Sequence, residues 1–175
     1  FIFRAAELAA PIDYQTTRFD TSIAYVKDRW QLEAGYNVSL FENDNQSLQW
    51  ENPFTGIFGA QLGQLAEPPD NQFHQFMLTG SWNQSRYLSL AGQVAMGRMT
   101  QDDAFVQPTV NLDLVNPGLP RANLDGEVDT RIVNLRATSN LTRNLRARIQ
   151  YRYDERDNDS PRDFYTQVIT DTFVT

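Results

Sequence analysis

The sequence predicts an all-β chain that forms a segment of an antiparallel transmembrane β-barrel. The first observation behind this prediction is a long stretch, Arg29 to Phe41, in which apolar and polar residues alternate. A period of two is typical of a strand whose two faces meet different surroundings. About eleven residues tilted by roughly 45° rise about 25 Å, which is the height of the apolar band on a membrane barrel. Strands of soluble domains are usually about half as long.

The second observation is that such strands come in pairs. The alternation returns from Leu145 to Asp154, and a weaker copy, with a polar face of small residues, runs from Tyr87 to Met99. Each of these strands has an alternating partner just upstream, as in a β-hairpin. We therefore expect about seven strands in one barrel segment that covers residues 1–175, in a chain that is incomplete at both ends. The hairpins are expected at about 13–41, 73–99 and 128–154, with a further strand from Phe164.

The third observation is that short and long connections alternate. Tight polar turns are expected at Lys27–Asp28, 83–85 and 140–144, whereas long polar segments cover 42–72 and 100–126. Short periplasmic turns and long extracellular loops are typical of outer-membrane barrels. The sequence thus favours the bacterial outer membrane as the location of the chain.

Aromatic residues flank two of the tight turns. Tyr25 and Trp30 surround the first, and Trp82 and Tyr87 surround the second. At a membrane surface these residues would form part of an interfacial girdle. The alternative is aromatic cross-strand pairing in a soluble β-sandwich. Strand length and loop asymmetry favour the membrane, because sandwich strands are about five or six residues long.

Composition excludes several classes of protein. With 15 Lys and Arg against 22 Asp and Glu, the net charge is −7, so nucleic acid is not an expected partner. The chain contains no Cys, which excludes disulfides, thiolate metal sites and covalent haem attachment within it. Catalysis is not expected either, since the paired carboxylates Asp102–Asp103 and Asp154–Glu155 lie in or beside polar loops, with no apolar pocket to raise a pKa.

The polar faces of the three hairpins predict the surface of a wide lumen. Small closed barrels fill their interior with their own side chains. Here the inward faces combine charged residues with small ones, which suits a large barrel whose lumen holds something else. The residues expected to face a partner in the lumen are Glu33, Ser89, Ala91, Gln93, Ala95, Gly97, Arg146, Arg148 and Arg152.

Two features raise the question of a metal ion. His74 is the single histidine, and its parity places it on the outward face near the loops, where it lacks a ligand set. The acidic loop at 154–163 could bind Ca²⁺ through its carboxylates, although it lacks the spacing of an EF-hand. Ion pairing or solvation of this loop is favoured over calcium. No cofactor is therefore assigned to the chain itself.

Five stretches along the chain point to one known family. They are "SLFENDNQSLQWENPF" from Ser39, "PDNQFHQFMLTG" from Pro69, "GRMTQDDAFVQPTVN" from Gly97, "LPRANLDGEVDT" from Leu119 and "YRYDERDNDSP" from Tyr151. With these stretches, much of the chain resembles the MtrB/PioB family of decahaem-associated outer-membrane β-barrel proteins. The resemblance implies a porin-like sheath that holds a periplasmic multihaem (decahaem) c-type cytochrome in its lumen, so that electrons cross the outer membrane. It also implies that an extracellular multihaem cytochrome can dock outside.

On this interpretation, the small residues of the strand from Tyr87 to Met99 let the cytochrome approach the wall, and the arginines meet its carboxylates or haem propionates. The alternative is that the arginines pair with Glu33 or Asp154 of the barrel itself. Two other functions stay open. A diffusion porin would have an unplugged, conducting lumen, and a soluble β-rich binding domain would not need detergent.

Overall fold

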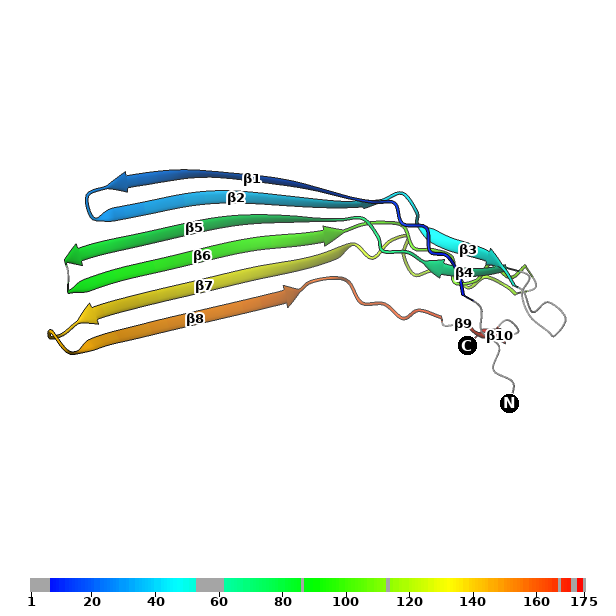
Figure 1. Ribbon diagram of the computed structural model, residues 1–175. Helices are drawn as coiled ribbons and strands as arrows, with labels where there is room; N and C mark the ends of the chain where they lie inside the picture. The colour runs from blue at the N-terminus through cyan, green and yellow to red at the C-terminus, as the bar shows by residue number, and fades with distance from the viewer. Residues whose placement is uncertain are drawn as a thin grey trace.

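Six long strands form one antiparallel sheet in the order β1-β2-β5-β6-β7-β8 (Figure 1). The computed structural model describes residues 7–52, 62–85, 87–112 and 114–166, together with the backbone of 168–170 and 173–174. No helix in this part of the chain is long and apolar enough to cross a membrane. The long strands are β1 (Tyr14–Lys27), β2 (Trp30–Asn43), β5 (Asn71–Ser85), β6 (Leu88–Gln101), β7 (Gly126–Asn140) and β8 (Arg146–Asn158).

The sheet has a turn end and a loop end. Figure 1 shows a gently curved single layer with the tight turns at one end and the long connections at the other. In the first turn, Asp28 has a φ of 46°, a left-handed conformation that Asp tolerates better than most residues. This turn joins the directly opposed pair Lys27 and Trp30. The expected asymmetry between short turns and long loops is therefore present in the fold.

The three predicted hairpins are all found, and each is longer than predicted at the loop end. They span 14–43, 71–101 and 126–158 rather than 13–41, 73–99 and 128–154. The extra residues are polar on both faces of the sheet, as Glu127 and Arg156 illustrate, so they carry no alternating pattern. Their backbone hydrogen bonds nevertheless continue the ladder.

The first long loop contains a small hairpin that the sequence analysis missed. β3 (Ser47–Glu51) pairs with β4 (Leu62–Ala66) in a separate two-stranded sheet. Trp50 lies directly opposite Gly63, and its ring occupies the space that a side chain at Gly63 would need. Asn43 holds the base of this hairpin, because its Nδ2 donates to the Pro68 carbonyl at 2.9 Å.

The strand expected from Phe164 was wrong in position. Residues 161–166 form no strand, and the following β9 (Val168–Thr170) pairs with β10 (Phe173–Val174) instead of β8. The segment before β9 is attached to the second long loop. Arg121 Nε lies 2.5 Å from Asp163 Oδ2, and the rings of Phe105 and Tyr165 meet edge to face at 5.6 Å. These contacts hold the chain at the loop end, away from the edge of β8.

A single layer buries little of its own surface. Among the described residues, Ala95 is the buried hydrophobic side chain, at 3% exposure. Neither face of the long sheet is covered by a second layer in the described part of the chain (Figure 1). Since soluble domains bury an apolar face against a second layer, both faces of this sheet have to meet material outside the chain.

Candidate functional site: the two faces of the sheet

The pairing register separates the six long strands into two unlike faces. Directly opposed residues of antiparallel strands point to the same side of a sheet. On the apolar face, one row across the six strands consists of Ile23, Ala34, Leu78, Val94, Val133 and Tyr153. On the polar face, the neighbouring row consists of Ala24, Glu33, Thr79, Gln93, Asn134 and Arg152.

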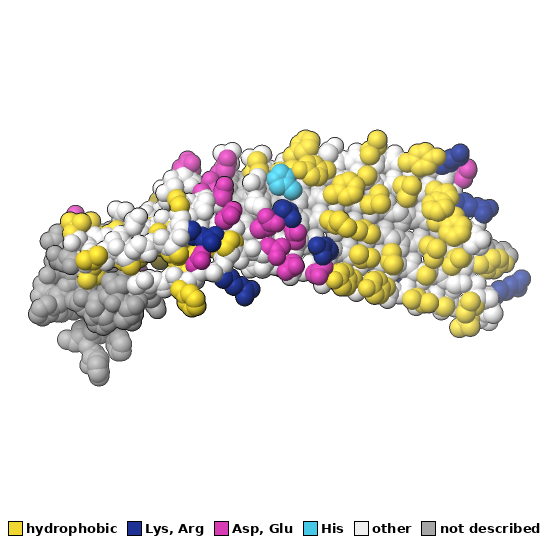
Figure 2. Space-filling view, turned by 180° about the vertical axis from the view of Figure 1, so that it is seen from behind, with side chains coloured by type: hydrophobic (Ala, Val, Ile, Leu, Met, Phe, Trp, Pro, Cys, Tyr) yellow, Lys and Arg dark blue, Asp and Glu magenta, His cyan; other side chains and the backbone are white. Residues whose placement is uncertain are grey.

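The apolar face carries large hydrophobic side chains in the open. Ile23 is 75% exposed, Ile149 is 72% exposed and Leu78 is 46% exposed. Figure 2 shows hydrophobic side chains, in yellow, gathered over the half of the sheet that ends in the tight turns. Contiguous apolar patches of this extent are not left in water by monomeric soluble proteins. The face therefore suits the hydrocarbon of a membrane.

The border of the apolar band runs diagonally across the sheet. The last directly opposed apolar pairs toward the loop end are Phe19–Val38, Phe76–Met96 and Val133–Tyr153. Val38 lies opposite His74, and Met96 lies opposite Arg131, so the border shifts by two residues toward the turn end from each hairpin to the next. A shift of two residues is about 6.6 Å along the strands, and neighbouring hairpins are two strand spacings, about 9.6 Å, apart. The ratio of these two lengths corresponds to a strand tilt of about 35°. This is the tilt that strands adopt in membrane barrels.

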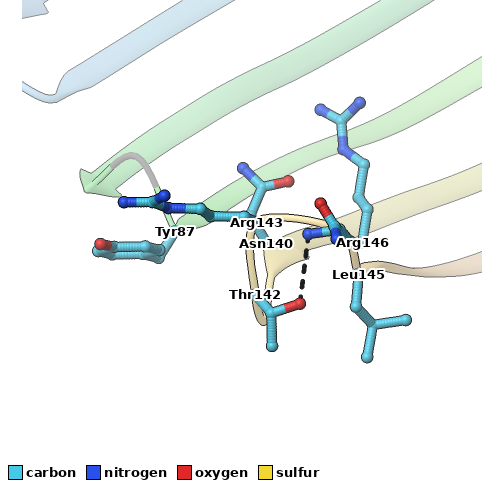
Figure 3. A pocket seen from close by; sticks show the side chains of 7 residues that line it. Tyr87, Asn140, Thr142, Arg143, Leu145 and Arg146 are labelled. Carbon is cyan, nitrogen blue, oxygen red and sulfur yellow. Dashed lines mark hydrogen bonds between the residues drawn. The ribbon is translucent and has the colours of Figure 1, made fainter.

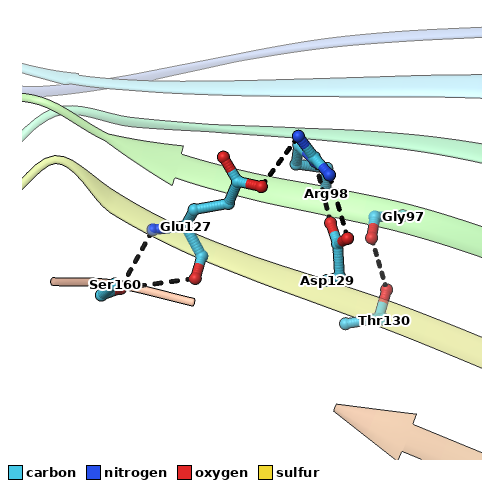
Figure 4. A network of polar contacts seen from close by, with 6 residues as sticks. All are labelled: Gly97, Arg98, Glu127, Asp129, Thr130 and Ser160. Atoms are coloured by element: carbon cyan, nitrogen blue, oxygen red, sulfur yellow. Dashed lines mark hydrogen bonds and ion pairs between the residues drawn. The ribbon is translucent and has the colours of Figure 1, made fainter. Parts of the chain in front are cut away.

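A belt of charged side chains begins directly beyond this border (Figure 4). Arg98 on β6 donates two hydrogen bonds to the carboxylate of Asp129 on β7, from Nε to Oδ1 at 2.8 Å and from Nη2 to Oδ2 at 3.0 Å. Its Nη1 lies 2.8 Å from Glu127 Oε1. Arg131 and Glu155 form a further ion pair at 3.1 Å. Charges cannot sit in hydrocarbon without a large cost, so this belt marks the level of the lipid headgroups.

His74 lies in this belt, on the outward face near the loop end, as its parity predicted. The Tyr36 hydroxyl lies 2.8 Å from its Nδ1. The possible calcium site takes a different form from the one expected. Asp159 of the acidic loop joins Glu127 and Asp129, with carboxylate oxygens within 4.8 Å of one another. Arg98 already forms ion pairs with two of these carboxylates, so ion pairing stays favoured over calcium, as the sequence analysis expected for the acidic loop.

The turn end has the aromatic residues expected of an interfacial girdle. The rings of Trp30 and Trp82 stack on the apolar face at 5.4 Å with an interplanar angle of 20°. The turn between β7 and β8 extends beyond the neighbouring turn between β5 and β6, as expected for tilted strands. This offset between the two turns leaves an open cavity lined by Tyr87, Thr142 and Arg143 (Figure 3).

The residues predicted to face a lumen partner all lie on the polar face. Glu33, Gln93 and Arg152 even occupy one row, on β2, β6 and β8. Ser89 and Ala91 follow on the same face of β6, and Arg146 and Arg148 on that of β8. The register thus brings these side chains onto one surface.

The sequence left open that the predicted lumen arginines pair with Glu33 or Asp154 of the barrel itself, and the structure agrees with this in part. Arg152 Nη2 lies 3.5 Å from Asp154 Oδ2, and both side chains are more than half exposed. Glu33 cannot take part, because it lies four strand spacings from Arg152, about 19 Å away. In the described part of the chain, Arg146 and Arg148 form no ion pair.

Comparison with known proteins identifies the family. The model of the outer membrane beta-barrel porins MtrB/PioB matches residues 1–175. The chain belongs to the MtrB/PioB family. It is 34% identical, over 169 residues, to the outer membrane protein MtrB of Shewanella baltica (strain OS185). The match covers 96% of this chain and 24% of that relative, so the chain spans about a quarter of the relative's length. The sheet is therefore part of an outer-membrane barrel, with its apolar face toward lipid and its polar face toward the lumen.

One expectation about the lumen of this MtrB/PioB chain needs correction. The small residues of β6 were expected to let a partner approach the wall. Ala91 is exposed, but Ala95 is only 3% exposed. Gly97 is half-buried, and a Cβ there would lie 2.7 Å from the ring of Phe73. The ring of Phe73 on β5 leans over Gly97 on β6, and the end of Met77 lies beside Gly35 on β2 and Gln93 on β6. At this height, Phe73 and Met77 form part of the lumen surface.

Two lumen arginines of β7 and β8 were missed by the sequence analysis. Arg136 on β7 lies opposite Gln150, and Arg156 on β8 lies opposite Thr130, so both are on the polar face. Parity within each strand contained the signal for both residues. It was overlooked because Arg156 follows the predicted end of its strand, and because the face of β7 was judged only from its apolar residues.

Proposed function

We propose that this chain forms part of the wall of an outer-membrane barrel that encloses a periplasmic multihaem c-type cytochrome of the decahaem kind. Electrons would cross the outer membrane along its haems. The observation that carries the proposal is the flat lumen wall. Over the middle strands, Phe73 lies on Gly97, and Gln93 Nε2 donates to Met77 Sδ at 2.9 Å, so these side chains follow the sheet. A barrel that fills itself has side chains that project inward.

The physics of electron transfer explains why a sheath is needed. Tunnelling decays steeply with distance, so haems have to form a continuous chain across a hydrocarbon core about 30 Å thick. A cytochrome with a charged surface does not enter lipid unaided. The barrel supplies a lipid-facing exterior and a polar interior. Because this chain contains no Cys, the covalently held haems belong to the partner.

The proposal extends to an extracellular multihaem cytochrome docked at the loop end. The β3–β4 hairpin supports this part, since it extends beyond the long sheet at the loop end (Figure 1). Leu62 and Leu65 on β4 are 43% and 58% exposed. Exposed apolar side chains among polar loops are common at docking surfaces. Replacing both leucines with Ser is expected to release the extracellular cytochrome while the lumen cytochrome stays bound.

A diffusion porin is the second candidate function. The exposed lumen arginines support it, because rings of basic side chains select anions in open pores. The two candidates differ in what fills the lumen. A conduit is occupied and conducts ions poorly, whereas a porin is open.

The experiment that separates them is purification of the native protein in mild detergent, followed by absorbance and bilayer recordings. The conduit predicts a c-type haem spectrum that follows the barrel through size-exclusion chromatography at a constant ratio. It also predicts little ion conductance. A colourless barrel that conducts ions would contradict the conduit and support the porin.

A further inference from the structure

Five lumen arginines of β7 and β8 form a column, which we call the basic stripe. It occupies five of six consecutive rows between the two strands: Arg146 opposite Asn140, Arg148 opposite Thr138, Arg136 opposite Gln150, Arg152 opposite Asn134 and Arg156 opposite Thr130. The remaining row holds Asp154, the partner of Arg152. Ten residues from Arg146 to Arg156 extend about 33 Å along the strand. The stripe therefore runs through most of the height of the membrane.

The stripe is a local feature and does not reflect the composition of the chain, whose net charge is −7. The polar face of β5 and β6 carries Asn, Gln, Ser, Thr, Ala, Gly, Phe and Met, and no charged residue. On β1 and β2 the same face has Arg18, Asp20 and Glu33, which balance one another more closely. Positive charge is thus concentrated on one side of this lumen wall.

Most of the positive charge of the stripe is not neutralised within the described part of the chain. All five arginines are exposed, and Arg152 is the member with an ion pair in the described part of the chain. Like charges on neighbouring positions of one sheet face repel each other. An acidic surface laid along the stripe would remove this repulsion, and guanidinium groups bind carboxylates with two parallel hydrogen bonds.

We infer that the basic stripe is the docking surface for a strip of Asp and Glu carboxylates on the lumen cytochrome, and that it fixes which side of the cytochrome faces this wall. The inference rests on the proposed function. An acidic protein surface is the expected occupant because its charge is complementary to the arginines. Lipid is not an alternative, since it contacts the opposite face of the sheet. Shape complementarity alone would let a cytochrome rotate within a flat, uncharged lumen.

The first test is a charge reversal in the native complex. The variant Arg136→Glu/Arg148→Glu/Arg152→Glu is expected to lower the ratio of haem to barrel by about threefold or more, because carboxylates would then face carboxylates. Arg18→Glu is the matched control, on the same face of β1, and is expected to keep the ratio of the parent protein. Outer-membrane fractionation and the heat-induced mobility shift of the barrel show that each variant has folded.

The second test identifies the contact itself. Lys27 is the single lysine of the chain. In Arg148→Lys and Arg152→Lys, a carbodiimide should join the new amine to Asp or Glu of the cytochrome, with loss of water, and mass spectrometry should find the crosslinked peptides. Arg18→Lys should give few such crosslinks. If haem follows the barrel but the stripe lysines crosslink no more than the control, the stripe inference is overturned and the conduit stands. If no haem protein follows the parent barrel, the conduit fails and the stripe inference fails with it.

Discussion

The two faces of β8 differ at every step along the strand. Ile149 on the apolar face is 72% exposed, and Tyr151 is 54% exposed, while Arg148, Gln150 and Arg152 alternate with them on the polar face. Neither set of side chains is covered by another layer in the described part of the chain. The comparison shows that exposure has two meanings in this protein, because one face is open toward lipid and the other toward a lumen.

The largest effect is expected when a charge is placed on the wrong face. Leu78→Arg puts a guanidinium in the middle of the apolar band, and it should destabilise the barrel by about 2–4 kcal/mol. Thr79→Arg, one residue along β5, points into the lumen and should change stability little. Guanidinium unfolding of the refolded barrel in lipid measures both. Equal losses in the two variants would contradict the assignment of the faces.

Filling the flat lumen wall should have the next largest effect. A side chain at Gly97 would meet the ring of Phe73 at 2.7 Å and Thr130 Oγ1 at 2.8 Å. Gly97→Val is therefore expected to destabilise the barrel by about 1–3 kcal/mol through overpacking. The double variant Gly97→Val/Phe73→Ala should recover part of this loss, as measured by the same unfolding curves. A Gly97→Val protein with parent stability would show that Phe73 does not lie over the glycine.

A smaller effect is expected from the aromatic pair at the turn end. Trp30 and Trp82 stack on the apolar face at 5.4 Å. A double-mutant cycle with Trp30→Leu and Trp82→Leu should give a coupling energy of about 0.5–1.5 kcal/mol. Additive losses, with no coupling, would mean that each tryptophan acts separately as an interfacial anchor.

The smallest effect is expected in the charged belt. Arg98→Gln removes contacts to Asp129 and Glu127 at a solvent-exposed position. We expect a slight fall in the thermal unfolding midpoint at low salt, and no difference from the parent protein in 1 M salt, because exposed ion pairs are screened. A loss that persists in high salt would indicate that the belt is shielded from solvent.

Parity along each strand was sufficient to predict the faces of the sheet. The membrane imposes one environment on every second residue, so Trp30 through Leu40 could be assigned from the alternation alone. The prediction weakened beyond the border of the apolar band. There Arg98 and Asp129 occupy the outward face, so the alternation stops although the strands continue.

Other features depended on neighbours that are distant in sequence. The position of the Phe73 ring over Gly97 depends on the register between β5 and β6, and this register is not visible in either strand alone. The position of the segment before β9 follows from contacts of Asp163 and Tyr165 with the second long loop. A local pattern does not contain such contacts.

The most direct test of the account is a comparison of water access on the two faces within the native complex. The chain has no Cys, so single cysteines can be placed at Ala91 in the lumen, at Leu90 toward lipid and at the exposed turn residue Leu141. A charged, water-soluble maleimide should label Leu141→Cys readily and Leu90→Cys hardly at all. The account predicts that Ala91→Cys is protected in the haem-containing complex, because the cytochrome fills the lumen. Rapid labelling of Ala91→Cys in the native complex would mean an open lumen and would contradict the conduit.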